Sequence, residues 1–165
     1  MNESYAEASV KRVNTAGTYV IKFLLVFLCI LSFLLSAASQ ILLFVSAILI
    51  VACIYFFPRF NVEYEYVFCD GQLDFDKIMG NAKRKTALRI DFENVEVMAP
   101  EGSHSLDGYT HVNFKVKNFT SGRKEIKPYV IVTREGEMVN KILFEPDENM
   151  IQKIKNKSPR KVAAY

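Results

Sequence analysis

Charged residues are missing from one long part of this chain. From Phe23 to Phe57, 35 consecutive residues include no Asp, Glu, Lys, Arg or His. A single membrane helix is excluded, because about 20 apolar residues already span a hydrocarbon core. Burial as a helical pair inside a soluble protein is disfavoured, because a chain of 165 residues has too little other mass to cover it.

Cysteine is scarce, and the three residues of this type, Cys29, Cys53 and Cys69, lie far apart. Their spacing matches neither a zinc site nor a disulfide framework. Scattered thiols suit a reducing compartment. We interpret Cys69 as a small apolar filler rather than as a reactive nucleophile.

Catalytic signatures are missing as well. The sequence shows no nucleophile paired with a base, no paired carboxylates and no phosphate-binding loop, and no partner joins the adjacent Ser103 and His104. We therefore expect a protein that is not an enzyme and has no cofactor or metal, with an enzyme as the distant alternative. From Arg59 onward, 18 Lys and Arg face 16 Asp and Glu, a balance that predicts no nucleic-acid partner.

Small and polar residues interrupt the apolar run at 36–40, which predicts a hairpin of two transmembrane helices over residues 18–35 and 40–57. Pro58 ends the second helix, so the hairpin region is 18–58. A signal peptide cleaved near Ala38 is the alternative, but the mature chain would then begin inside a membrane helix.

Positive charges flank the hairpin on both sides. Lys11, Arg12 and Lys22 lie before it and Arg59 after it, while the connecting turn has no charge. The positive-inside bias therefore predicts a multi-pass protein of the cell membrane with both termini in the cytoplasm.

Beyond the hairpin, the hydrophobic period changes from helical to alternating. We expect a flexible tail at residues 1–17, a cytoplasmic domain at 59–158 and a C-terminal tail at 159–165. The domain should contain seven antiparallel strands that form a barrel or sandwich, closed by an amphipathic helix that begins near Pro146. Asp70-Gly71 predicts a tight turn, and Val112, Phe114 and Val116 are expected to point inward from one strand.

Four stretches carry a family resemblance: VEYEY at 62–66, CDGQL at 69–73, KRK at 83–85 and FEP at 144–146. With the hairpin, they resemble uncharacterised small bacterial membrane proteins with two spans and a C-terminal pleckstrin-homology-like (PH-like) domain, a family of unknown function. The resemblance implies a fold and a location at the bacterial inner membrane. Phosphoinositide-binding members of this superfold have basic residues around the first hairpin loop, and here that turn is the acidic Asp70-Gly71.

Two groups of basic residues are the candidate sites for anionic lipid headgroups or a protein partner. The denser group is Lys83, Arg84, Lys85 and Arg89, and the sparser one is Arg123, Lys124 and Lys127. The competing interpretation is a solvated turn whose charges are balanced by nearby aspartates. Whether the two groups share one face is left open by the sequence.

The leading hypothesis is a membrane-anchored binding or scaffold module that presents a PH-like domain at the inner leaflet. The alternative is a structural subunit that assembles with another membrane protein through small or polar residues of the hairpin, Ser32, Ser36, Ser46 and Ala47.

Overall fold

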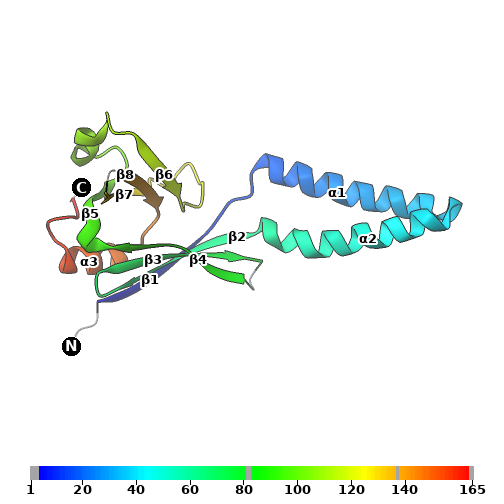
Figure 1. Cartoon of the computed structure of the whole chain (residues 1–165), viewed down its shortest axis with the longest axis horizontal. Helices are drawn as coiled ribbons and strands as arrows, with labels where there is room; N and C mark the ends of the chain where they lie inside the picture. The colour runs from blue at the N-terminus through cyan, green and yellow to red at the C-terminus, as the bar shows by residue number, and fades with distance from the viewer. Residues whose placement is uncertain (1–3, 81–82, 137, 164–165) are drawn as a thin grey trace.

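The structure is a computed structural model that describes residues 4–80, 83–136 and 138–163. It contains a β domain and a long helical hairpin that projects from one end of this domain (Figure 1). The hairpin contains α1 (Ala16–Leu35) and α2 (Gln40–Phe56), joined by a short 3-10 turn at Ser36–Ala38. These bounds agree with the predicted helices to within two residues.

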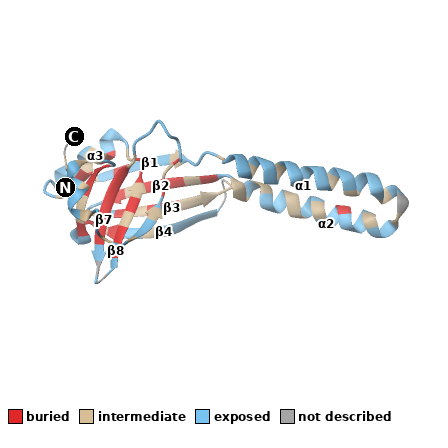
Figure 2. Ribbon diagram, turned by 90° about the horizontal axis from the view of Figure 1, so that it is seen from above, coloured by how far each residue is buried: buried red, intermediate tan, exposed pale blue. Residues whose placement is uncertain are grey.

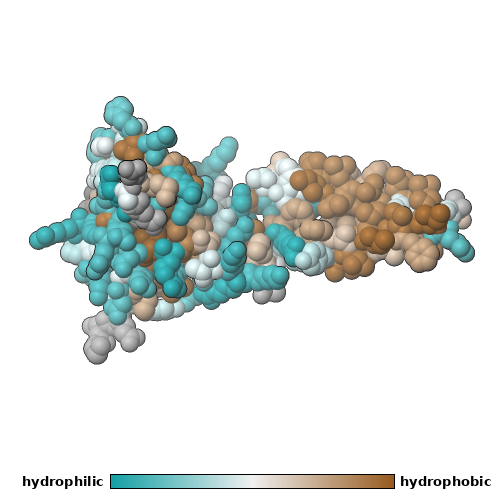
Figure 3. Space-filling view, viewed as in Figure 1, coloured by the Kyte–Doolittle hydropathy of each residue, from teal (hydrophilic) through white to brown (hydrophobic). Residues whose placement is uncertain are grey.

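The surface of the hairpin is apolar and uncovered. Both helices are described in full, and Ser46 is their one buried residue (Figure 2). Including the turn that follows α2, they give two candidate membrane spans of 20 and 21 residues. Core helices of a soluble protein would be mostly buried, so the soluble alternative is disfavoured. Figure 3 shows the hydrophobic surface over the hairpin and hydrophilic residues over the β domain.

The segment before the hairpin is a strand, so the prediction of a flexible tail is wrong for it. β1 (Tyr5–Lys11) pairs antiparallel with β2 (Val62–Cys69), from Lys11 opposite Glu63 to Tyr5 opposite Cys69. The hairpin is therefore the connection between two neighbouring strands of one sheet. Cleavage near Ala38 would remove β1 from that sheet, which argues against a signal peptide.

Eight strands form two four-stranded sheets in the described part of the chain, and the structure shows no closed barrel there. The first sheet has the order β1-β2-β3-β4, with β3 at Gln72–Met79 and β4 at Lys83–Asp91. The second has the order β5-β7-β8-β6, with β5 at Val95–Pro100, β6 at Phe114–Asn118, β7 at Tyr129–Glu135 and β8 at Met138–Phe144.

Two details differ from the expected antiparallel sandwich. β6 pairs parallel to β8. After β5 at one edge of the second sheet, the chain crosses to β6 at the opposite edge before it continues into β7 and β8. Val116, expected to point inward, is 60% exposed, since β6 is an edge strand with a neighbour on one side only. The Asp70-Gly71 turn is confirmed, with positive φ at both residues. It is the second connection of the sheet, because β1 and the hairpin precede it.

Aromatic residues fill the space between the sheets. Tyr66, Phe75 and Phe144 are fully buried, and their rings pack edge to face at centroid distances of 5.5 to 5.6 Å. The Tyr66 hydroxyl donates a hydrogen bond to the carbonyl of Phe119, and burial raises the pKa of Tyr66. Tyr64 and Tyr129 are buried as well, so these tyrosines belong to the core.

The C-terminal helix is confirmed as α3 (Glu148–Lys157). The Asp147 side chain caps it by accepting a hydrogen bond from the Met150 backbone N–H at 2.8 Å, and Met150 and Ile154 are fully buried. The expected tail at 159–165 is docked over part of its length. Met98 of β5 exchanges two backbone hydrogen bonds with the Lys161–Ala163 segment, at 2.7 and 2.9 Å.

Candidate functional site

Gly80, directly after β3, lies against the end of the hairpin. The Gly80 backbone N–H donates to the carbonyl of Asn61 at 3.1 Å. A Cβ atom added to Gly80 would lie 2.6 Å from the Cβ of Pro58, and the φ of Gly80 is +63°. This close approach therefore requires glycine. It places the basic residues that follow beside the chain that leaves α2.

Strand alternation divides the predicted basic cluster between two faces of the sheet. Arg84 lies on the outer face, where its Nε is 2.6 Å from Asp76 and its Nη2 is 3.0 Å from Glu65. Arg89 forms a bidentate pair with Asp74 at 2.6 and 2.7 Å. These two arginines are therefore engaged within the sheet. For them, the competing interpretation of charges balanced by nearby acids is the correct one.

The pKa values of the acids around Arg84 reflect this arrangement. The interaction with the Glu7 carboxyl group, followed by burial, raises the pKa of Glu65. Burial alone would raise the pKa of Asp76, but the hydrogen bond and charge of Arg84 hold it below its usual value. The hydrogen bond to Asp76 raises the pKa of Arg84. Arg84 is thus a structural cation of the outer face.

Three lysines lie on the opposite, inner face of the same strands. Lys85 is paired with Lys77, and Lys83 with Met79, whose side chain packs against the core and so identifies the face. Within the described residues, no carboxylate lies within ion-pair distance of these lysines. We call Lys77, Lys83 and Lys85 the inner lysine face. Sequence reasoning missed Lys77, although its position two residues after the core residue Phe75 was the available signal.

The second basic loop lies at the same end of the domain. Arg123, Lys124 and Lys127 are exposed in the β6–β7 connection. The Ser121 carbonyl in this loop accepts a hydrogen bond from the Val13 backbone N–H at 2.8 Å, just before α1 begins. The hydroxyl and the backbone N–H of Ser121 both donate to the buried Glu145 at 2.9 Å, which fixes the loop. This loop and residues 83–85 of the first group therefore lie where the β domain meets the hairpin, whereas Arg89, opposite Asp74, lies nearer the other end of β4.

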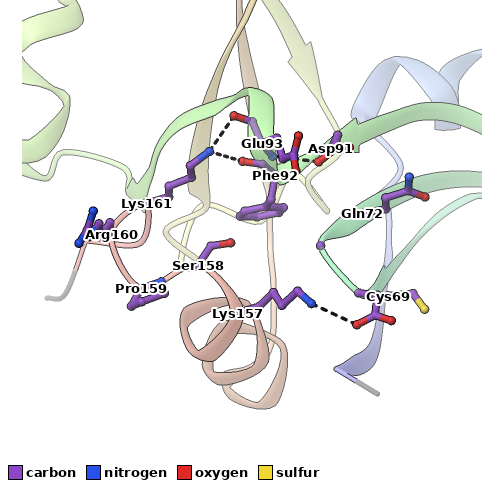
Figure 4. A pocket seen from close by; sticks show the side chains of 12 residues that line it. Cys69, Gln72, Asp91, Phe92, Glu93, Lys157, Ser158, Pro159, Arg160 and Lys161 are labelled. Atoms are coloured by element: carbon purple, nitrogen blue, oxygen red, sulfur yellow. Dashed lines mark hydrogen bonds and ion pairs between the residues drawn. The ribbon is translucent and has the colours of Figure 1, made fainter. Parts of the chain in front are cut away.

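A cavity of about 740 Å³ lies at the other end of the domain, beside the Asp70-Gly71 turn (Figure 4). Its lysines are already engaged: Lys157 pairs with Asp70 at 3.3 Å, and the Lys161 amino group donates to the carbonyls of Phe92 and Glu93. Cys69 lines this cavity and is exposed, so its interpretation as an apolar filler is wrong. Arg160 also lines the cavity, and among the described residues it has no carboxylate within ion-pair distance. The cavity therefore offers one unpaired cation, whereas the hairpin end offers several, which makes the cavity the weaker anion site.

The part of the chain that the structure describes contains no group of three His, Cys, Asp or Glu side chains arranged to hold a metal ion. His104 pairs with Asp107 at 3.1 Å on the exposed surface of a loop. The absence of a cofactor and of catalysis stays a prediction.

Two packed sheets with a C-terminal helix, preceded by two apolar helices, define a PH-like domain with candidate membrane spans. The chain belongs to the family described as Bacterial PH-like domain (DUF6106), whose model matches residues 2–164. The match includes β1 and the hairpin, so the family unit is the whole arrangement. No curated protein and no solved structure matches the chain.

Proposed function

We propose that this chain is a non-enzymatic membrane-anchored module that holds its PH-like domain on the cytoplasmic face of the membrane and binds anionic lipid headgroups there. The observation that carries the proposal is the pairing of β1 with β2. Because the hairpin connects these neighbouring strands, the chain enters and leaves the membrane at fixed points of one sheet, and residues 83–85 and the β6–β7 loop lie near those points.

Two contacts limit how far the β domain can move relative to the hairpin. The Lys22 side chain of α1 donates to Asn61 at 3.4 Å, and Gly80 contacts Pro58. The domain is therefore held with the Lys83 end of the inner lysine face and the β6–β7 loop nearest the bilayer. Each lysine or arginine close to an anionic leaflet contributes about 1 kcal/mol of attraction, which decays over a Debye length of roughly 8 Å.

The cytoplasmic orientation rests on charge. Lys11, Arg12, Lys22 and Arg59 lie at the domain end of the hairpin, and the turn at residues 36–39 has no charge. Short segments rich in lysine and arginine stay in the cytoplasm.

Assembly through the hairpin receives less support. The Ser32 hydroxyl donates to the Cys29 carbonyl at 2.9 Å, and the Ser46 hydroxyl donates to the Leu43 carbonyl at 2.8 Å. Ser46 is also buried between α1 and α2. These hydroxyl groups are thus satisfied within their own helices, and binding to lipid headgroups is the favoured function. A protein partner for the basic surface is the outcome if lipid binding fails.

The test uses a variant in which a two-residue turn replaces residues 13–60, so that β1 stays paired with β2; circular dichroism first verifies its fold. Lys83→Glu/Lys85→Glu is expected to weaken sedimentation with vesicles containing phosphatidylglycerol by at least about 30-fold, because loss of the two positive charges alone removes about 2 kcal/mol of attraction and the new carboxylates add repulsion. Lys153→Glu/Lys155→Glu on α3 makes the same change in net charge and is expected to have little effect. Equal losses in both variants would contradict a specific surface, and no binding at all would favour a protein partner.

A further inference from the structure

A cleft lies between the end of α2 and the β3–β4 turn, with a volume of about 660 Å³. Val51, Ile54 and Tyr55 of α2 form one wall, and Met79 of β3 lies opposite. Arg59, in the turn after α2, and Lys83, at the start of β4, also line it. The volume is within the range of about 300 to 1,000 Å³ that small-molecule sites occupy.

The two halves of this cleft differ in chemistry along the direction of the hairpin. Val51 and Ile54 are 66% and 71% exposed and continue the apolar surface of α2. Arg59 and Lys83 lie where that apolar surface ends. Apolar groups at hydrocarbon depth and cations at headgroup depth are the chemical profile of a phospholipid molecule.

Arg59 is held in position by its neighbour. Its guanidinium group lies 3.8 Å from the centre of the Tyr55 ring and donates a hydrogen bond to the Tyr55 hydroxyl. A guanidinium group has five N–H donors, so others are free for an anion. Among the residues that the structure describes, no carboxylate lies within ion-pair distance of Arg59 or Lys83.

We propose that this cleft binds one anionic glycerophospholipid, with its phosphate between Arg59 and Lys83 and an acyl chain along Val51 and Ile54. The site rests on the proposed membrane orientation. An extended peptide fits less well, because an unpaired backbone is not tolerated beside lipid at the depth of Val51. The contact between Gly80 and Pro58 fixes the separation of the two walls.

The sequence contains no tryptophan, so a single introduced tryptophan reports on its own surroundings. The test uses the full chain in bilayers that contain brominated phosphatidylglycerol or brominated phosphatidylcholine. Ile54→Trp places the reporter in the cleft, and Phe23→Trp places a control reporter on α1, where Phe23 is 70% exposed and does not line the cleft. Quenching gives the preference of each position for the anionic lipid.

Ile54→Trp is expected to show a preference for phosphatidylglycerol on the order of 30-fold, from about 1 kcal/mol for each of the two cations, and Phe23→Trp a preference close to one. Arg59→Gln or Lys83→Gln should each lower the preference at Ile54→Trp by about fivefold. Lys153→Gln, which removes a cation of α3 that lies outside both the cleft and the inner lysine face, should leave it unchanged.

Equal preferences at the two reporters, or a preference that survives Arg59→Gln and Lys83→Gln, would overturn the site. Relief of quenching by millimolar glycerol phosphate would show that a soluble phosphate takes the place of the lipid and would overturn it too. The vesicle assay of the proposed function lacks α2 and Arg59. The proposed function can therefore be correct even if no lipid binds in the cleft, and a lipid can bind in the cleft even if the vesicle assay shows no binding.

Discussion

Gly80 offers a sharp test of how the β domain meets the hairpin. Alanine at this position must adopt a φ of +63° and place its Cβ 2.6 Å from the Cβ of Pro58, with the Pro58 carbonyl carbon and oxygen at 3.1 Å. Gly136 is a matched control, because its φ is +62° and a Cβ there would meet nothing within 4 Å. The two substitutions share the backbone strain and differ in the contact.

The expected magnitudes follow from these distances. Left-handed strain costs about 1 kcal/mol for an L-residue, so Gly136→Ala should lower stability by about that amount. Gly80→Ala adds overpacking against a backbone, which costs roughly 1 to 3 kcal/mol more. At about 4 °C per kcal/mol, the melting temperature should fall by about 4 °C for Gly136→Ala and about 8 to 16 °C for Gly80→Ala.

The assay is thermal unfolding of the full chain in one detergent, followed by near-ultraviolet circular dichroism of the buried tyrosines. Pro58→Gly in the Gly80→Ala background should recover part of the loss, with a coupling of more than about 0.5 kcal/mol, because it removes the nearest clashing atom. Equal shifts in Gly80→Ala and Gly136→Ala would refute the contact, and with it the fixed position of the basic residues.

Three further predictions concern the outer face, β1 and the hairpin. Folding raises the pKa of Glu65. The stability that the protonated Glu65 carboxyl group contributes is therefore fully present below the pKa of the unfolded chain, about 4.3, and is lost as the pH rises through the pKa of the folded protein. Glu65→Gln should therefore melt above the wild type at neutral pH and equally in acid; a lower melting temperature at neutral pH would contradict the raised pKa. Deletion of residues 1–60 exposes the edge of β2 and should give an aggregating domain, whereas replacement of residues 13–60 by a short turn should give a monomer, as gel filtration would show. Mild oxidation should link Cys29 to Cys53 within one chain, since their sulfur atoms are 3.3 Å apart, and mass spectrometry that finds only links between chains would count against the hairpin.

The elements with strong local signals could be predicted from the sequence. The charge-free run gave both helices, because bilayer thickness sets their length. Asp70-Gly71 gave its turn, and the spacing of Met150 and Ile154 gave the buried side of α3. In each case, the information lies within about 20 neighbouring residues.

The features that depend on distant pairing were missed. Ala6, Ala8 and Val10 of β1 do alternate with polar residues, but alanine has little strand propensity. The partner strand also begins more than 50 residues later, beyond the hairpin. Parallel pairing of β6 with β8 likewise depends on the tertiary arrangement.

The candidate site was found in part, for a related reason. The sequence stretch 83–85 was interpreted as a turn, within which neighbouring charges would act together. As the start of β4, it directs Arg84 to one face and Lys83 and Lys85 to the other. Charge density along the sequence therefore could not distinguish the arginines that pair with acidic residues from the lysines that remain unpaired. It also could not show that Lys77 belongs to the inner lysine face.

The most direct test of the central claim is the sidedness of two cysteines towards a membrane-impermeant maleimide. Cys69 is exposed on the β domain, and Ser39→Cys in a Cys69→Ser background places a thiol in the turn of the hairpin. Two membrane spans predict that Cys69 reacts only in inverted vesicles and Ser39→Cys only in intact spheroplasts. Reaction of both thiols from the same side would contradict the hairpin as a membrane anchor.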